Sequence, residues 1–386
     1  MHNPRVVITG VGLITPLGDT PEALWRALLA GATAVRDWPD LAAAGFRGTR
    51  ACRIANFAAD PLRRGRALAI AAAEQAVQHA ALTLPENSGV FMGSTIGEST
   101  AFERAAEGAT EGKSIDLSDH RVPSFTSGVR QRFGLNGPQQ SLATACTAGN
   151  YAVGSALAAL RAGRCEVALA GAAEPFSRLS QVGFSRARAM AADVCRPFDA
   201  RRSGMLLGEG AAVFVLERAD AAQRRGATPL AEVVALGLSC DAYHPTAPQP
   251  DGLGMRAAMQ AAIDAAAITS ADIDWVNTHG SGTRASDAAE AKALHGLFGA
   301  DMPSISGSKG ALGHALGAAS AIELALCVLG LQHQTLPPTP GHEQPDAEGG
   351  IACTRAPLAR RLRWVMNNAF AFGGLNSALL LRAWEA

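Results

Sequence analysis

Short apolar runs alternate along this chain with alanine-rich stretches of helical length. The runs at residues 6–10, 89–93, 167–171 and 213–217 have the composition of buried strands, and residues 22–29, 66–81 and 151–163 have that of helices. This alternation is typical of layered proteins in which helices cover a sheet. We therefore expect an α/β fold.

A polar, arginine-rich stretch interrupts this pattern after residue 217, and the alternation restarts at residues 231–238. We place a boundary there, which divides the chain into an N-terminal half (1–228) and a C-terminal half (229–386). A chain of 386 residues is long enough for two or three domains, or for one structure built from two similar halves.

Two segments, one in each half, have the same layout. Residues 141–145 lead through Cys146 into an apolar helix, and residues 304–306 lead through a glycine-rich loop and His314 into another. This layout suggests an internal duplication with one reactive residue at each equivalent helix start. The opposite interpretation, that the two segments are unrelated, stays equally open.

The composition narrows the class of protein. The chain has 34 basic and 34 acidic residues and is 48% hydrophobic, which favours a large core and gives no sign of disorder or nucleic-acid binding. Its seven scattered cysteines have no C-x-x-C spacing, so we predict neither disulfides nor a metal site. The longest apolar stretch, 317–331, contains Glu323 and is shorter than the roughly 20 residues of a membrane span. We expect a cytoplasmic protein that binds no membrane.

Cys146 lies among small residues at a predicted junction between a strand and a helix. The unpaired N–H groups of a helix start lower the pKa of a thiol and make it a better nucleophile toward a thioester. The alternative is a buried space-filling cysteine. We prefer that interpretation for the other six cysteines, but not for Cys146.

Two histidines lie in loops of small residues. His279 follows a short apolar strand, and His314 follows a glycine. Two imidazoles can donate hydrogen bonds to a carbonyl on which negative charge develops. Taken alone, each histidine fits a structural role as well as a catalytic one. The similar surroundings of both favour a shared catalytic role.

Two charged residues accompany the histidines. Lys309 is one of only three lysines among the 34 basic residues, and it precedes His314 by five positions. A compact ammonium can tune a neighbouring group where a guanidinium does not fit. Glu290 follows His279 on a predicted helix and is either a partner of a cation such as Lys309 or a solvated surface carboxylate.

These motifs, together with the C-terminal segment 367–376 (NNAFAFGGLN), resemble the β-ketoacyl-acyl carrier protein synthases. The similarity is to the elongating type I/II branch, which uses a Cys-His-His set, and it extends over residues 6–374. It implies a condensing acyltransferase of fatty acid or type II polyketide synthesis, including a polyene pathway.

The resemblance assigns roles to the reactive residues. It implies that Cys146 accepts the acyl group and that His279 and His314 hold the carbonyl of a malonyl thioester during decarboxylation. The resulting carbanion attacks the acyl thioester on Cys146. Backbone N–H groups of Cys146 and Phe372 match the family's oxyanion hole.

The same resemblance implies supporting roles for other residues. Lys309 and Glu290 belong to a charged network beside the second histidine, and Phe372 is the gating phenylalanine. Ser281 and Thr283 match hydroxyls that hold the phosphopantetheine arm of the acyl carrier protein. No tightly bound cofactor is implied.

The fold implied is the thiolase fold, with two five-stranded mixed sheets in a five-layered αβαβα arrangement. Members are normally dimers, so residues 136–144 are expected to approach a second subunit. The partners implied are an acyl carrier protein and either a second copy of the chain or a chain-length factor.

Several positions depart from the family pattern. Leu312, Ala371 and Leu375 replace a hydroxyl residue, a glycine and a threonine. The stretch 97–121 is shorter than in fatty-acid enzymes, and Phe102 falls where a smaller aliphatic residue lines the acyl tunnel. We therefore expect an altered preference for chain length or shape.

Other activities fit the sequence less well. A thiolase needs a second cysteine in the C-terminal glycine-rich loop, and an initiating synthase pairs its cysteine with one histidine and an asparagine. A catalytically idle chain-length subunit keeps the fold without the nucleophile, whereas this chain retains Cys146. Arg63, Arg64 and Arg66 form either a basic patch for an acidic carrier protein or a solvated helix start.

Overall fold

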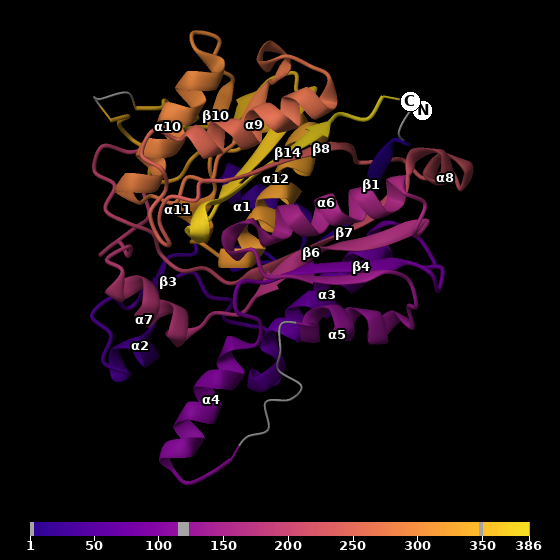
Figure 1. The fold of residues 1–386 in the computed structure, drawn as a ribbon. Helices are drawn as coiled ribbons and strands as arrows, with labels where there is room; N and C mark the ends of the chain where they lie inside the picture. Colours follow the sequence, from indigo (N-terminus) through magenta and orange to yellow (C-terminus); the bar gives the residue numbers. More distant parts are fainter. Residues whose placement is uncertain (1–3, 115–122, 347–349, 386) are drawn as a thin grey trace.

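The computed structural model describes residues 4–114, 123–346 and 350–385 (Figure 1). Five strands build the N-terminal half, in the spatial order β5-β4-β6-β7-β1. Their bounds are Val6–Ile14 (β1), Gly89–Gly93 (β4), Gln139–Leu142 (β5), Val167–Glu174 (β6) and Gly210–Arg218 (β7). Strand β4 is parallel to β5 and β6, and β7 is antiparallel to β6 and β1.

Five strands of the C-terminal half repeat this pattern in the order β10-β9-β13-β14-β8. Their bounds are Ala231–Cys240 (β8), Trp275–Asn277 (β9), Ser304–Ser306 (β10), Trp364–Phe370 (β13) and Leu375–Arg382 (β14). Strand β9 is parallel to β10 and β13, and β14 is antiparallel to β13 and β8. The two halves therefore have the same topology.

Strands β1 and β8 join the halves. Val6, Val7 and Ile8 pair with Val233, Glu232 and Ala231, so hydrogen bonds connect all strands of both halves into one ten-stranded sheet. The two five-stranded mixed sheets expected from the sequence are therefore both present, and they are joined at the edge between β1 and β8. The predicted boundary after residue 228 falls between α8 (Ala219–Arg224) and β8 and stays a prediction.

Helices form three of the five layers, as Figure 1 shows. Helices α3 (Arg64–His79) and α5 (Pro123–Phe133) cover the outer face of the N-terminal strands, and α9 (Leu253–Ala266) and α10 (Arg284–Phe298) lie on the outer side of the C-terminal strands. Helices α6 (Ala148–Arg161) and α12 (Ala319–His333) lie between the two sets of strands. The αβαβα arrangement of the thiolase fold is confirmed.

Helix α12 is the most apolar element of the core. All residues from Ala319 to Leu331 are buried. The segment Leu316–His333 is long and apolar enough to cross a membrane by composition, but 89% of it is buried inside the protein. Packing between the two halves accounts for its composition.

The remaining elements lie around this core. The helices are α1 (Pro21–Leu29), α2 (Pro39–Ala43), α4 (Ser99–Thr110), α7 (Arg178–Arg186) and α11 (Lys309–Leu312), and two short strand pairs join β2 (Arg36–Asp37) to β3 (Arg50–Ala51) and β11 (Thr335–Leu336) to β12 (Leu358–Ala359). Helix α4 projects from the body of the molecule in Figure 1. It belongs to the stretch 97–121 that the sequence singles out, whose last seven residues lie outside the described part.

Candidate active site

Cys146 lies at the strand–helix junction that the sequence predicts. Strand β5 ends at Leu142, and Ala145 takes a left-handed backbone conformation (φ 49°) at the start of a short 3₁₀ turn, Ala145–Thr147. Helix α6 follows directly. Cys146 is therefore presented just ahead of the helix, with 7% of its surface exposed.

His314 is fixed by its backbone before it enters the second central helix. Its N–H donates to the carbonyl of Leu206 (2.7 Å), and its own carbonyl accepts from the N–H of Gly208 (2.9 Å). Leu316 then takes a left-handed conformation (φ 46°) and opens the 3₁₀ turn that leads into α12. The two helix starts thus share a layout, but Cys146 follows the left-handed residue whereas His314 precedes it. The expectation of reactive residues at equivalent positions is therefore wrong in detail.

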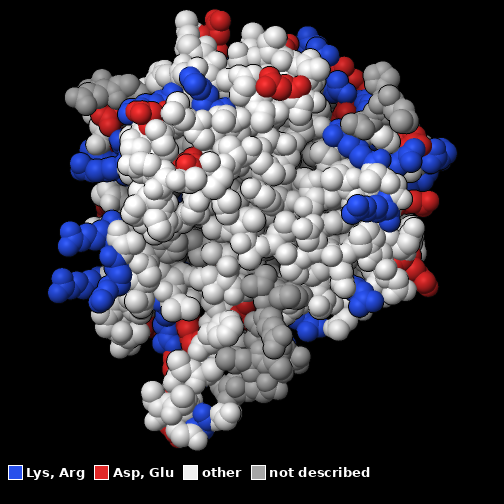
Figure 2. Space-filling model, in the orientation of Figure 1, with Lys and Arg blue, Asp and Glu red and all other residues white. Residues whose placement is uncertain are grey.

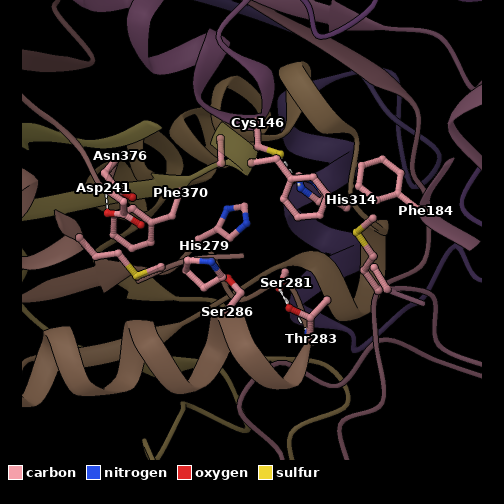
Figure 3. Close-up of a pocket in the computed structure, with 16 residues that line it drawn as sticks. Cys146, Phe184, Asp241, His279, Ser281, Thr283, Ser286, His314, Phe370 and Asn376 are labelled. Atoms are coloured by element: carbon pink, nitrogen blue, oxygen red, sulfur yellow. Dashed lines mark hydrogen bonds between the residues drawn. The ribbon is translucent and has the colours of Figure 1, made fainter. Parts of the chain in front are cut away.

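The three predicted reactive side chains meet in one place (Figure 3). Nε2 of His314 lies 3.1 Å from Sγ of Cys146. The rings of His279 and His314 pack edge to face, with 5.2 Å between their centroids. Gly149 on α6 permits the close approach of α6 to α12, because a Cβ atom at this position would lie 2.5 Å from the backbone nitrogen of Ala321 on α12.

The backbone of His279 is held on both sides. Glu290 on α10 accepts hydrogen bonds from the N–H groups of His279 and Gly280, both at 2.9 Å. Nζ of Lys309 donates to the carbonyl of His279 at 2.6 Å. The histidine loop therefore leaves β9 in a fixed direction.

Lys309 forms its ion pair with Glu323 rather than with Glu290. The distance from Nζ to the Glu323 carboxylate is 2.6 Å, and both side chains are nearly fully buried. Ser308 donates a further hydrogen bond to the same carboxylate oxygen. Both alternatives given for Glu290 are therefore wrong: its carboxylate is buried and engaged by backbone N–H groups, so it is neither the ion-pair partner of Lys309 nor a solvated surface group. In the sequence, Glu323 is visible only as an interruption of an apolar run, and a charge inside such a run is a signal for a buried ion pair.

Burial, not the helix terminus, dominates the ionisation of Cys146. Burial raises the pKa of its thiol to about 12, opposed by the positive charge of Lys309. The expected lowering of the thiol pKa is therefore wrong. Burial, together with Lys309, also lowers the pKa values of His279 and His314 well below their usual range. At neutral pH the site holds a neutral thiol beside two neutral imidazoles.

A small cavity of about 40 Å³ lies against Cys146 and the two histidines. Its walls also include the predicted residues Ser281, Thr283 and Phe372. The hydroxyls of Ser281 and Thr283 lie 2.9 Å apart, and Phe372, 38% exposed, packs against Phe184 with 5.4 Å between ring centroids. The cavity thus connects the buried sulfur to residues near the surface.

Two further polar residues of the cavity were missed from the sequence. Nδ2 of Asn376 donates to the carboxylate of Asp241 at 2.7 Å, beside the loop that contains Phe372. Asp287 does not line this cavity; it is buried behind Ser281 and accepts from the Gly282 N–H and the Ser281 hydroxyl. Neither carboxylate lies in a sequence pattern that sets it apart from a solvated surface residue.

Phe102 does not line the cavity at Cys146. It is 40% exposed and borders a surface groove with Leu179 and Val182 of α7. The expected place in an acyl tunnel is therefore not seen. Of the residues that depart from the family pattern, Ala371 lines the cavity, Leu312 is buried in α11 and Leu375 begins β14.

The arginines at the start of α3 have different environments. Arg64 turns inward to an ion pair with Glu209 and donates to the carbonyls of Ile54 and Phe57. Arg66 donates to Gln131. Arg64 is therefore not available to a surface patch. In residues 4–114, 123–346 and 350–385, no group of three His, Cys, Asp or Glu residues has the geometry of a metal site.

Comparisons with known proteins place this geometry in a family. Residues 3–222 match the model of the β-ketoacyl synthase N-terminal domain, and residues 230–343 match that of the C-terminal domain. The chain belongs to the β-ketoacyl synthase family. It is therefore a condensing acyltransferase that forms carbon–carbon bonds in fatty acid or type II polyketide synthesis.

Relatives and solved structures cover nearly the whole chain. The ketoacyl synthase alpha subunit of the tetracenomycin polyketide synthase of Streptomyces glaucescens is 36% identical over 98% of this chain and 96% of its own length. A 3-oxoacyl-[acyl-carrier-protein] synthase 2 of Rhizobium meliloti is 35% identical over 98% of this chain and 99% of its own.

Two solved structures have the same fold. A chain of the ishigamide ketosynthase/chain length factor superposes with a TM-score of 0.94 at 35% identity and covers both chains fully. A chain from AntDE:AntF, a type II polyketide acyl carrier protein in complex with its ketosynthase bound to the hexaketide, has a TM-score of 0.93 at 26% identity and covers 99% of this chain and 100% of that one.

Proposed function

We propose that Cys146 carries the acyl group and that His279 and His314 act on the malonyl thioester. The observation that carries this assignment is the 3.1 Å contact between Nε2 of His314 and the sulfur, with the second imidazole packed against the first. A neutral thiol needs a base to become a nucleophile, and His314 is within reach of its proton.

Acylation begins with transfer of the thiol proton to His314. The thiolate of Cys146 attacks the acyl thioester of the carrier, and the phosphopantetheine thiol leaves with a proton. Ser281 and Thr283, whose hydroxyls line the cavity, hold the arm during this step. Backbone N–H groups of Cys146 and Phe372 stabilise the tetrahedral oxyanion.

Condensation uses the two imidazoles as hydrogen-bond donors. Their low pKa values keep them neutral, so each carries one N–H, and together they bind the malonyl thioester oxygen as its charge grows. Carbon dioxide leaves, the enolate carbon attacks the acyl carbonyl, and the Cys146 thiolate is expelled. Lys309, Glu323 and Glu290 hold the histidine loops, and Phe372 controls entry.

We propose that an acyl carrier protein delivers both substrates. The similarity to a ketosynthase solved with its carrier protein supports this partner. A cytoplasmic location fits a carrier-dependent synthase. Leu312, Ala371 and Leu375 remain candidates for an altered acyl preference.

The second subunit is either another copy or a chain-length factor. Strand β5 is an edge strand of the sheet, and it forms residues 139–142 of the predicted contact segment 136–144. Figure 2 shows one face of the molecule on which the charged side chains lie mostly along the rim and the centre is largely uncharged. Similarity to a ketosynthase/chain length factor structure also fits an idle shaping subunit, but the intact Cys146–His314 pair favours the active role.

Intact mass spectrometry after incubation with acyl carrier thioesters tests the assignment. The parent protein is expected to gain one acyl group, and Cys146→Ala is expected to gain none. Cys165→Ala is a matched control, because it removes another buried thiol of the same half. Acylation that survives in Cys146→Ala would reject the proposal.

A further inference from the structure

A cluster of buried polar side chains lies behind the reactive residues, at the centre of the molecule. Its members come from five elements and are fully buried. They are Asn150 of α6, Asn277 of β9, Ser320 of α12, Asn367 of β13 and Ser377 of β14. We call this set the amide cluster. Buried amides cost free energy unless their hydrogen bonds are made, so the arrangement of these groups is specific.

Asn367 is the centre of the amide cluster. Its Nδ2 donates to Oδ1 of Asn150 and to the carbonyl of Ser320, both at 2.9 Å. Its Oδ1 accepts from Nδ2 of Asn277 at 2.8 Å, and its carbonyl accepts from Nδ2 of Asn150 at 3.1 Å. One side chain thus bonds to three separate elements.

Each of these elements leads to a reactive residue. Asn150 follows Cys146 by four residues on α6, and Asn277 precedes His279 by two at the end of β9. Ser320 follows His314 by six at the start of α12. Asn367 therefore touches the supports of Cys146, His279 and His314 without touching any of the three.

The two histidines differ in how they are tied to Cys146. His314 contacts the sulfur directly, and its helix is also tied to α6 by the Asn150 N–H, which donates to the Ser320 hydroxyl at 3.2 Å. The partners that hold the His279 backbone, Glu290 and Lys309, both belong to the C-terminal half. The polar tie from β9 to α6 runs through the amide of Asn367.

We propose that Asn367 is a positioning residue of the condensation step, setting the place of His279 relative to Cys146 through Asn277 and Asn150. This inference rests on the roles proposed above for the two reactive residues. Acylation depends on the Cys146–His314 contact, which has its own ties. Condensation also needs His279 in register, and small misplacements of a catalytic group cost large factors in rate.

The test separates the two steps in single turnovers. Acyl loading of Cys146 is followed by intact mass, and condensation is then started by adding malonyl carrier protein to the preloaded enzyme. In Asn367→Ala we expect loading to stay close to the parent rate and condensation to fall about 100-fold.

Asn368→Ala is the matched control. Asn368 is the next residue of the same strand and is equally buried, but its Nδ2 donates to the sulfur of Met259 on the other side of the sheet. Both steps are expected to stay close to the parent rates in this variant. A purely structural effect of removing a buried amide would lower both steps in both variants.

A second variant keeps the test decisive if Asn367→Ala does not fold. Asn277→Ala removes only the side-chain hydrogen bond from Asn277 to Asn367 and leaves the backbone pairing of β9 with β13 in place. It is expected to lower condensation more than loading. Equal losses in the two steps, or unchanged condensation, would overturn the role of Asn367. Loading that does not depend on Cys146 would instead reject the proposed function, whatever the asparagine variants do.

Discussion

The starts of the two central helices, α6 and α12, have the same backbone layout but carry different residues. In each, a left-handed residue, Ala145 or Leu316, opens a 3₁₀ turn that leads into a buried helix. The N-terminal turn carries Cys146, whereas the C-terminal turn carries Gly317. The scaffold is repeated, and the chemistry comes from what each copy places on it.

The loops that follow β4 and β9 are also alike in structure and different in the residues they carry. After β4, the carboxylate of Glu174 accepts from the N–H groups of Thr95, Ile96 and Gly317. After β9, Glu290 accepts from the N–H groups of His279 and Gly280. Both halves use a buried carboxylate to shape the loop, but only the C-terminal loop bears an imidazole. Function thus arises from asymmetry within a symmetric frame.

The largest effect is expected from removing Cys146, the residue that distinguishes the N-terminal turn from the C-terminal one. Cys146→Ala keeps the turn and is expected to lower condensation at least about a thousandfold, because no acyl-enzyme can form. Turnover with malonyl and acyl carrier thioesters measures it. Near-normal turnover would mean that the difference between the turns is not the catalytic one.

The two halves also differ in the partners of their buried carboxylates. Glu174 accepts hydrogen bonds from backbone N–H groups and Ser94, whereas Glu323 forms an ion pair with Lys309. Lys309→Met leaves Glu323 buried without its cation, and we expect a loss of about 3–5 kcal/mol in the free energy of unfolding. Urea unfolding gives the value. The double variant Lys309→Met/Glu323→Gln should recover much of the loss, and no recovery would contradict the pairing.

Gly317, the counterpart of Cys146, tolerates no side chain. A Cβ atom there would lie 2.6 Å from the Thr95 nitrogen and 2.8 Å from a Glu174 oxygen. Gly317→Ala is expected to destabilise the protein by about 1–3 kcal/mol. Gly183→Ala, where a Cβ meets nothing within 4 Å, is the control. Equal stability of the two variants in thermal or urea unfolding would contradict the tight fit of the second turn.

The loop carboxylates give the smallest effect, seen in the pH dependence of stability. Burial raises the pKa of Glu290 to about 8, above its unfolded value, although its backbone hydrogen bonds oppose the shift. The folded state therefore keeps a proton that the unfolded state has lost. Stability from this group is complete below the unfolded pKa and is lost as the pH rises through about 8.

Between pH 6.5 and 8 the parent protein should lose up to about 1.4 kcal/mol per pH unit through this carboxyl. Glu290→Gln should lack this slope, even if its stability is lower throughout. Unfolding curves of both proteins across that range measure the difference. Parallel slopes would show that Glu290 is already ionised in the folded protein.

Local patterns predicted an α/β fold and the family resemblance predicted its αβαβα layers, and Cys146, His279 and His314 lie together as expected. Burial explains where the predictions failed. Cys146, His279 and His314 were found because small residues surround each of them, and such surroundings are visible in sequence. Helix α6 begins at Ala148, three residues before the predicted start, because the turn after Cys146 already continues into the helix.

Long-range partners could not be read from the chain. Glu290 and Glu323 stand at similar spacings from the histidines, and only the packing of α12 shows which of them meets Lys309. The pKa of Cys146 was predicted in the wrong direction because burial outweighs the helix terminus. The edge shared by β1 and β8 likewise depends on pairing across more than 200 residues.

The left-handed backbone of Ala145 has a consequence for how the nucleophile works. A non-glycine residue in this region costs the fold about 1–2 kcal/mol, and the surrounding packing must hold it there. Alanine has the smallest side chain that still limits the backbone conformations open to this loop. The direction of the Cα–Cβ bond of the next residue is thereby set during folding, and an incoming thioester meets a sulfur that is already aimed.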